Sequence, residues 1–185
     1  MNDFEYKLTY KISVIGDGRV GKTSLIKKFT KGSFQKDYIK TIGAQFSVFD
    51  KIIDDVNIRL LFWDIAGQDD FHFLRNSFFK NSKASIIVFS LEENSLGSTS
   101  FKSVAHWNRE IHEYCGEIPI VLFANKVDLI DENNLDLNSI QTLVKDEGFQ
   151  GYYITSAKTG QGVPDAFNAI INNLYYQYKE KEKSG

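Results

Sequence analysis

Residues 8–30 read LTYKISVIGDGRVGKTSLIKKFT, and this stretch decides the fold. Leu8–Ile15 is apolar and rich in β-branched residues, which predicts a buried strand. A glycine-rich turn follows, and Lys22–Thr30 then carries three apolar residues on one helical face. We therefore expect a strand, a loop and a helix in direct succession.

The other hydrophobic runs extend this unit to an α/β domain. Continuous or alternating apolar runs predict five further strands, at Gln45–Ile53, Asn57–Ile65, Ala84–Ser90, Ile118–Ala124 and Tyr152–Thr155. Asp54 and Asp55 separate the first two of these runs and predict a hairpin turn. Helical spacing indicates helices around 101–115, 140–144 and 164–178. We expect a six-stranded, mixed but mostly parallel sheet with about five flanking helices.

The composition fits one globular domain. The 185 residues are 42% hydrophobic, and 22 Lys and Arg face 24 Asp and Glu, for a net charge of −2. A chain of this length buries ~70% of its unfolded surface, so a small disulfide-stapled scaffold is excluded. Only four of the cations are Arg, which argues against a nucleic-acid surface. We expect a domain over residues 1–178 and a flexible charged tail over 179–185.

The loop between the first strand and helix is suited to phosphate. Gly16–Thr23 matches the pattern G-x-x-x-x-G-K-S/T at a strand-to-helix junction. Glycines let backbone N–H groups surround a phosphate at a helix N-terminus, and Lys22 adds a positive charge. The Thr23 hydroxyl is suited to ligate Mg²⁺. The alternative, a glycine-rich turn with a surface lysine, requires a chance match on the order of one per cent.

A second motif, Asp64–Gln68, follows the apolar strand that ends near Trp63. At that strand end, Asp64 is suited to hold magnesium through a water molecule. Gly67 is suited to offer its backbone N–H to a γ-phosphate, and Gln68 to orient an attacking water. Taken singly, each of these residues is more often a turn residue.

A third motif, Asn125–Asp128, follows the strand that ends at Ala124. A carboxylate only accepts hydrogen bonds, so Asp128 suits the two adjacent donors of guanine and meets an acceptor on adenine. A site of this kind discriminates by ~10⁴-fold or more, which favours GTP over ATP. Composition alone leaves a solvated turn open for Asn125 and Lys126. Ser156–Lys158, after the last strand, is placed to close the base pocket through the Ala157 N–H.

In this order and over nearly the whole chain, the four motifs resemble those of the small GTPases of the Ras superfamily. Trp63–Asp64, Thr41–Gly43 and Phe46 make the chain most similar to the Rab branch. The resemblance implies a P-loop NTPase G domain that binds GTP or GDP with Mg²⁺. It also implies a molecular switch that slowly hydrolyses GTP to GDP and phosphate.

The resemblance assigns further roles. Thr41 is the switch I threonine, whose hydroxyl ligates Mg²⁺ and whose N–H meets the γ-phosphate, Phe34 packs edge-on against guanine, and Tyr38 covers the phosphates. Switch I spans about 34–45 and switch II about 64–79. The expected catalytic residues are Gln68, Lys22, Thr41 and Gly67, and the expected metal ligands are Thr23, Thr41 and Asp64. The expected nucleotide contacts are Gly16, Gly18, Arg19, Val20, Gly21, Lys22, Thr23, Ser24, Phe34, Tyr38, Thr41, Gly67, Asn125, Lys126, Asp128, Leu129, Ser156, Ala157 and Lys158.

The resemblance also implies protein partners, namely effectors, exchange factors and GTPase-activating proteins that bind the two switches. Phe46, Trp63 and Phe78 match the aromatic patch that Rab proteins present to effectors, although plain core aromatics are an equal alternative. Rab sequences usually carry Thr, Glu and Arg where this chain has Ile65, Asp69 and Asp70, so the usual switch II contacts are in doubt.

Several residues lie outside the family pattern. Arg19 replaces a small residue of the phosphate loop, and we expect it to point to solvent, with a cis arginine finger as the alternative. The single cysteine, Cys115, falls on an apolar helix face and is expected to be a packed thiol. One cysteine favours a reducing, cytoplasmic location. We expect the protein to be a monomer.

The sequence predicts no signal peptide, membrane span or direct lipid anchor. The final residues, KEKEKSG, contain no prenylation cysteine, and Asn2 in place of Gly excludes N-myristoylation. Either the tail was truncated, or the native protein is soluble or is recruited to membranes by partners.

Two rival functions remain at this stage. A GTP-loaded scaffold that never cycles needs none of Thr41, Gly67 and Gln68, so their joint presence counts against it. An ATPase or kinase is disfavoured because Asn125–Asp128 supplies guanine chemistry.

Overall fold

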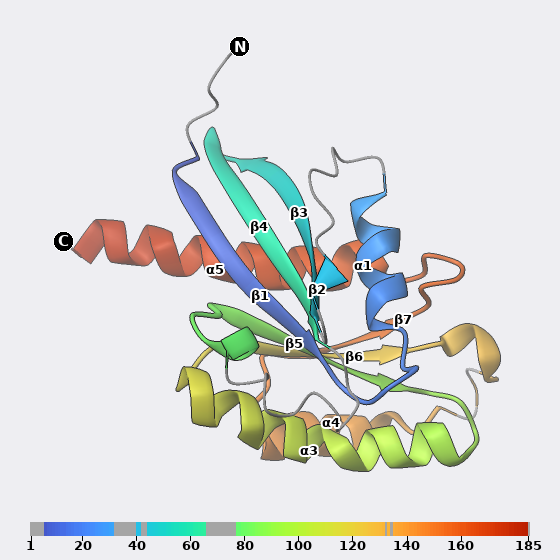
Figure 1. Cartoon of the computed structure of the whole chain (residues 1–185). Coiled ribbons are helices and arrows are strands. Elements are labelled where there is room, and N and C mark those ends of the chain that lie inside the picture. Colours follow the sequence, from blue (N-terminus) through green and yellow to red (C-terminus); the bar gives the residue numbers. More distant parts are fainter. Residues whose placement is uncertain are drawn as a thin grey trace.

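A computed structural model describes residues 6–31, 40–41, 44–65, 77–131, 133 and 135–184 (Figure 1). The elements follow in the order β1 (Leu8–Ile15), α1 (Lys22–Thr30), β2 (Lys40–Thr41), β3 (Ala44–Ile53), β4 (Val56–Ile65), β5 (Ala84–Ser90), α3 (Ser95–Cys115), β6 (Ile120–Asn125), the 3-10 turn η2 (Val127–Leu129), α4 (Leu137–Asp146), β7 (Tyr152–Thr155) and α5 (Val163–Ser184). Residues 77–79 are also helical.

The strands form one mixed sheet in the order β2-β3-β4-β1-β5-β6-β7. Strands β4, β1, β5, β6 and β7 run parallel to one another, whereas β3 is antiparallel to β4. Asp54 and Asp55 join β3 to β4 with φ values of 46° and 63°, as a two-residue hairpin turn with two left-handed residues requires. The six-stranded mixed sheet and the hairpin are therefore confirmed, and the two-residue β2 is an addition at the edge.

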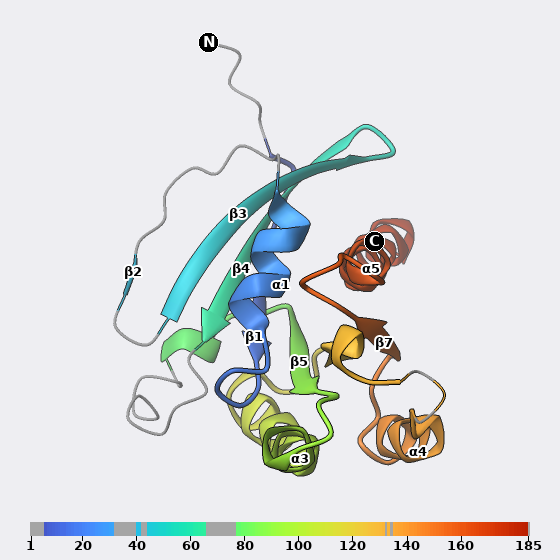
Figure 2. The same ribbon diagram turned by 90° about the vertical axis from the view of Figure 1, so that its right-hand side faces the viewer.

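The two faces of the sheet carry separate hydrophobic clusters. On one face, α1 and α5 cover Ile12, Leu60 and Phe123, and on the other, α3 and α4 cover Ile87 and Leu122. Figure 2 shows α1 and α5 on the opposite side of the sheet from α3 and α4. Successive residues of each central strand point to opposite faces, so both faces must be apolar. This explains the continuous apolar runs in the sequence.

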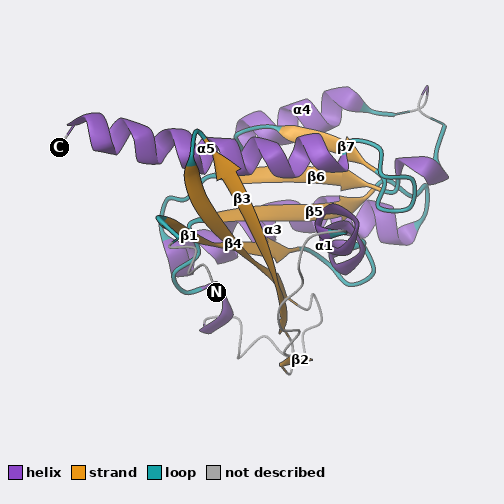
Figure 3. Cartoon of the chain, turned by 90° about the horizontal axis from the view of Figure 1, so that it is seen from above, coloured by secondary structure: helices purple, strands orange, loops and turns teal. Residues whose placement is uncertain are grey.

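The closing helix is longer than predicted. α5 continues to Ser184. Residues 179–184, which were expected to form a flexible tail, are therefore helical. Residues 180–184 are exposed, and Figure 3 shows this end of α5 extending beyond the sheet. Within the described residues, no helix has both the length and the apolar character needed to cross a membrane.

Candidate functional site

The five parallel strands end at one edge of the sheet, and the four predicted motifs follow four of these ends. Ligands of open α/β folds bind at this edge. The phosphate loop leaves β1 at Gly16, whose φ is 134° and where an added Cβ would lie 2.2 Å from the Val88 carbonyl oxygen. No residue with a side chain fits there without displacing β5. The close approach explains the first glycine of the motif.

Lys22 lies under the loop rather than on the surface. Its side chain is buried, with 7% of the residue exposed, and Nζ donates to the carbonyl oxygens of Gly16 (2.9 Å) and Asp17 (2.8 Å). Gly21 precedes α1 in a left-handed conformation, and no side chain caps the helix. The first N–H groups of α1 are thus left without a side-chain cap, an arrangement suited to an anion. The donor set fits a polyphosphate.

Thr23 and Asp64 come together from α1 and the end of β4. The Thr23 hydroxyl donates to Asp64 Oδ2, although the two residues lie 41 positions apart. Burial raises the pKa of the Asp64 carboxyl, while the Thr23 hydrogen bond and the nearby Lys22 and Lys27 oppose this rise. A buried carboxylate beside a hydroxyl supplies the oxygen ligands that Mg²⁺ prefers, so this pair fits the predicted metal site.

Asn125 joins the phosphate loop to the predicted base pocket. Its Nδ2 donates to the Val20 carbonyl at 2.8 Å, and its Oδ1 accepts from the Ala157 N–H at 3.1 Å and the Thr155 hydroxyl at 3.2 Å. The side chain is 1% exposed. A solvated turn is therefore excluded for this residue. An added Cβ on Gly21 would lie 2.3 Å from Asn125 Nδ2, so the second loop glycine makes room for this contact.

Asp128 lies opposite the loop after β7. The Ser156 hydroxyl donates to Asp128 Oδ1 at 2.6 Å, and Lys158 Nζ lies 3.6 Å from Oδ2. The Ser156 hydroxyl also accepts from the Thr159 N–H at 3.1 Å. Because the Asp128 side chain is only 11% exposed, a ligand that pairs with it must meet it in a largely desolvated site. Such a carboxylate selects for donors on its partner.

The other predicted contacts differ in placement. The side chain of Val20 is fully buried in the core, so only its backbone is available to a ligand of the loop. Arg19 is exposed, as expected. Ser24 and Leu129 are also exposed. Thr41 lies in β2. Phe34, Tyr38, Gly67 and Gln68 lie outside the described residues.

One contact of the phosphate loop has no counterpart in the sequence analysis. Asp17 Oδ1 accepts from Trp107 Nε1 at 2.8 Å, and Asp17 Oδ2 accepts from the Ser103 hydroxyl at 2.9 Å. Both donors lie on α3, one helical turn apart. The four-residue spacing of Ser103 and Trp107 places both side chains on one face of the helix. The sequence does not indicate that this helix face contacts the phosphate loop.

The aromatic residues assigned to an effector patch contact one another. The Trp63 ring lies 5.8 Å from Phe46 and 6.1 Å from Phe78, centroid to centroid. Phe78 is 8% exposed, whereas Phe46 and Trp63 are partly buried. Cys115 is half-buried, its thiol donates to the Phe79 carbonyl, and burial raises its pKa, as expected for a packed thiol.

Comparisons with known proteins decide the family. The model of the Ras family matches residues 11–176. The chain belongs to the Ras family. Among its relatives, Ras-related protein Rab-19 of Mus musculus is 31% identical over 182 residues, which cover 95% of this chain and 82% of the relative. Rab-37 of Homo sapiens is 33% identical, covering 93% and 76%, and Rab-9A of Homo sapiens is 31% identical, covering 89% and 82%.

The family membership confirms the resemblance to Ras and Rab proteins and the G-domain fold. Members of this family are GTPases that bind guanine nucleotides and interact with regulators and effectors, and this chain is therefore a small GTPase. The residues that bind nucleotide and metal in this chain remain predictions, supported by the geometry described above.

Proposed function

We propose that this protein is a GTP/GDP switch that binds its nucleotide with Mg²⁺ at the carboxyl edge of the sheet and slowly hydrolyses GTP. One observation carries the proposal: Asn125 links the Val20 carbonyl of the phosphate loop to the Ala157 N–H of the predicted base pocket. This link supports the proposal that a phosphate site and an adjoining guanine site bind one nucleotide.

Phosphate binding falls to Lys22 and the start of α1. Lys22 Nζ, which now contacts two loop carbonyls, is within reach of phosphates bound in the loop. Thr23 and Asp64 would hold the metal, the hydroxyl directly and the carboxylate through water. Bound there, Mg²⁺ supplies positive charge to the phosphate oxygens. Asp128 accepts from the guanine ring N–H and amine, and Ala157 N–H donates to the guanine carbonyl.

Hydrolysis requires a positioned water and stabilised charge. Gln68 orients a water that attacks the γ-phosphorus in line. The bond to the β–γ bridging oxygen breaks, and GDP and phosphate result. Lys22 and backbone N–H groups, including that of Gly67, stabilise the charge that spreads over the oxygens. Arg19 is exposed and left-handed, with φ 68°, so an arginine supplied by an activating protein, worth ~10³ to 10⁵ in rate, suits this site.

Loss of the γ-phosphate then releases Thr41 and Gly67 and changes the surface that effectors bind. The relatives named as Rab proteins favour a Rab-like role in membrane trafficking, in which exchange factors, activating proteins and effectors engage switch I and switch II. Peripheral recruitment to membranes through such partners is part of this proposal.

The test begins with the nucleotide that the purified protein carries. The protein is denatured, the released nucleotide is identified by chromatography, and fresh protein is loaded with GTP and Mg²⁺ while phosphate release is followed for hours. We expect guanine nucleotide and slow hydrolysis. In Gln68→Leu, hydrolysis should fall while GTP binding persists.

The matched control is Gln161→Leu, which changes an exposed glutamine in the loop before α5. Its rate should equal that of the wild type. GTP that stays intact in the wild type would instead support the scaffold, and adenine nucleotide would overturn the role of Asp128. Equal rates in Gln68→Leu and the wild type would remove Gln68 from the mechanism.

A further inference from the structure

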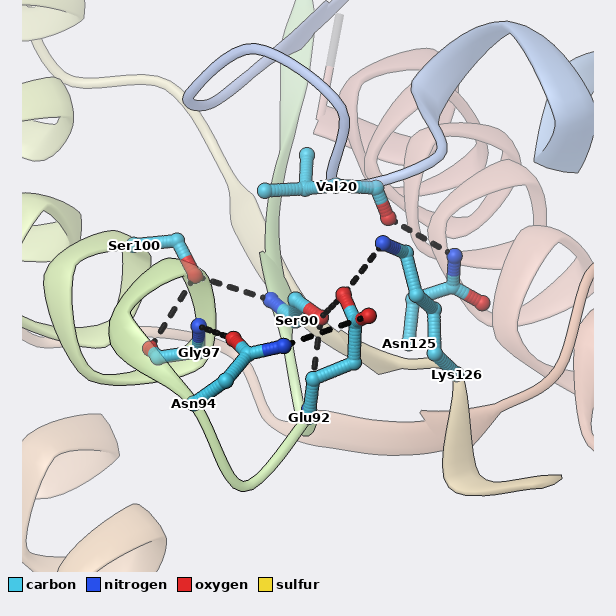
Figure 4. A network of polar contacts seen from close by, with 8 residues as sticks. All are labelled: Val20, Ser90, Glu92, Asn94, Gly97, Ser100, Asn125 and Lys126. Carbon is cyan, nitrogen blue, oxygen red and sulfur yellow. Dashed lines mark hydrogen bonds and ion pairs between the residues drawn. The ribbon is translucent and has the colours of Figure 1, made fainter. Parts of the chain in front are cut away.

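An acidic residue outside the four motifs contacts the third motif. Glu92 lies two residues beyond the end of β5, and its Oε2 lies 2.5 Å from Lys126 Nζ (Figure 4). The two side chains are only 20% and 22% exposed. A pair this short and largely shielded from water is worth more than an exposed surface pair.

The Glu92 carboxylate is oriented before it meets Lys126. The Ser90 hydroxyl donates to Oε2 at 2.8 Å, and Asn94 Nδ2 lies 3.5 Å from Oε1. The contact with Lys126 and, to a smaller extent, those with Ser90 and Asn94 lower the pKa of Glu92, so the carboxylate is ionised at neutral pH. Glu92 thus presents a fixed negative charge to the lysine.

The loop that carries Glu92 is anchored at both ends. At its start, the Leu91 N–H donates to the Asn125 carbonyl at 2.8 Å, which ties the loop to the end of β6. At its end, Asn94 Oδ1 accepts from the Gly97 N–H at 3.1 Å and caps α3. An added Cβ on Gly97 would lie 1.9 Å from the Glu92 carbonyl oxygen, so the helix packs directly against the loop.

Lys126 in turn lies between the residues that define the base pocket. Its backbone is left-handed, with φ 72° and ψ 34°, directly after the buried Asn125 and two residues before Asp128. A lysine side chain is flexible, and fixing it on ligand binding costs conformational entropy. An ion pair that already restricts Lys126 reduces that cost.

We propose that Glu92 is a positioning residue for guanine-nucleotide binding, because it holds the Lys126 ammonium at the base pocket and makes the β5–α3 loop part of the site. The inference rests on the proposed function, since it requires that the pocket at Asn125–Asp128 bind guanine nucleotide. It adds a residue that lies in none of the four motifs.

The test is the dissociation rate of a fluorescent GDP analogue in Mg²⁺, chased with excess unlabelled GDP. Glu92→Gln keeps the size of the side chain and one acceptor oxygen and removes its charge. We expect dissociation about tenfold faster, the equivalent of about 1.4 kcal/mol. The matched control, Glu93→Gln, changes the adjacent exposed glutamate and should leave the rate within about twofold, as surface substitutions do.

A second measurement separates positioning from general support of the fold. In a Lys126→Met background, Glu92→Gln should add little, because Glu92 acts through the lysine. Glu92→Asp, which keeps the charge, should restore part of the wild-type rate. If Lys126→Met does not fold, Ser90→Ala replaces it and should speed release in the same direction by a smaller factor.

Equal rates for Glu92→Gln and the wild type would overturn the inference. So would slower release from Glu92→Gln, which would mean that Glu92 draws Lys126 away from the nucleotide, or additive effects in the double variant. A wild-type protein that binds no guanine nucleotide would overturn the proposed function itself, and this outcome is visible before any variant is made.

Discussion

The contact between the phosphate loop and α3 gives a sharp stability prediction. Asp17 accepts from Trp107 Nε1 at 2.8 Å and from the Ser103 hydroxyl at 2.9 Å. Asp17→Ala removes the acceptor of both donors, but the consequence differs between them. Ser103 has an alternative acceptor, the Thr99 carbonyl at 3.0 Å, whereas Trp107 is 3% exposed and its indole N–H donates to Asp17 from a buried position. The cost should therefore come mainly from the indole N–H.

A buried donor left without its acceptor costs ~1–3 kcal/mol. For a chain of this size, each kcal/mol lowers the melting temperature by about 2–4 °C, so a loss near 2 kcal/mol lowers it by about 4–8 °C. Trp107→Phe removes the donor and keeps an aromatic ring in place. Because both variants break the same hydrogen bond, the double variant should be less destabilised than the sum of the two, by about 1 kcal/mol or more.

The assays are thermal unfolding for the melting temperature and urea unfolding for the free energy, both followed by far-UV circular dichroism at one fixed excess of GDP and Mg²⁺ for all variants. Ser103→Ala is the control, and it should lower the free energy of unfolding by less than half as much as Asp17→Ala does. Additive losses in Asp17→Ala and Trp107→Phe would refute the reasoning, since they would show that the two side chains do not stabilise the protein through one another.

Three further predictions concern the site. Gly16→Ala should prevent folding, because its Cβ would lie 2.2 Å from a carbonyl oxygen, whereas Gly18→Ala, with nothing within 4 Å, should fold normally; thermal unfolding compares the two. Burial raises the pKa of Asp64 in the folded protein, so as the pH rises above 3.8 the unfolded chain releases the Asp64 proton before the folded chain does. The metal-free protein should therefore lose stability with rising pH until the folded-state pKa is passed. In Asp64→Asn this loss should be absent from urea unfolding in EDTA. Ser156→Ala removes the hydroxyl that donates to Asp128 at 2.6 Å and should weaken the preference for GDP over ADP, measured by competition binding.

Most of the fold was predictable because its signals are local. The bounds of β1, α1, β5 and β7 follow directly from apolar runs and helical spacing. The hairpin turn at Asp54 was predictable for the same reason, since its residue types favour a left-handed backbone. By contrast, the helical form of residues 179–184 was missed. These residues have no apolar face, and the helix there continues from a packed segment of α5 rather than from its own pattern.

The site divides in the same way. Motif spacing predicted that Thr23 and Asp64 come together, because the phosphate loop after β1 and the end of β4 lie at the same edge of the sheet. The contacts of Asp17 and Glu92 were not predictable, because each depends on where α3 packs against the sheet. No sequence pattern fixes that position. It results from the apolar cluster that Val104 and Ile111 form beneath β5 and β6.

The two missed contacts share a structural consequence. Helix α3 meets the phosphate loop through Trp107 and Asp17, and the loop at its N-terminus meets the base motif through Glu92 and Lys126. Asn125 already joins the phosphate loop to the base motif directly. The helix therefore supplies a second connection between the same two parts of the site, and both of its contacts are made by charged carboxylates in partly buried positions. Any displacement of α3 along the sheet would therefore disturb both contacts at once.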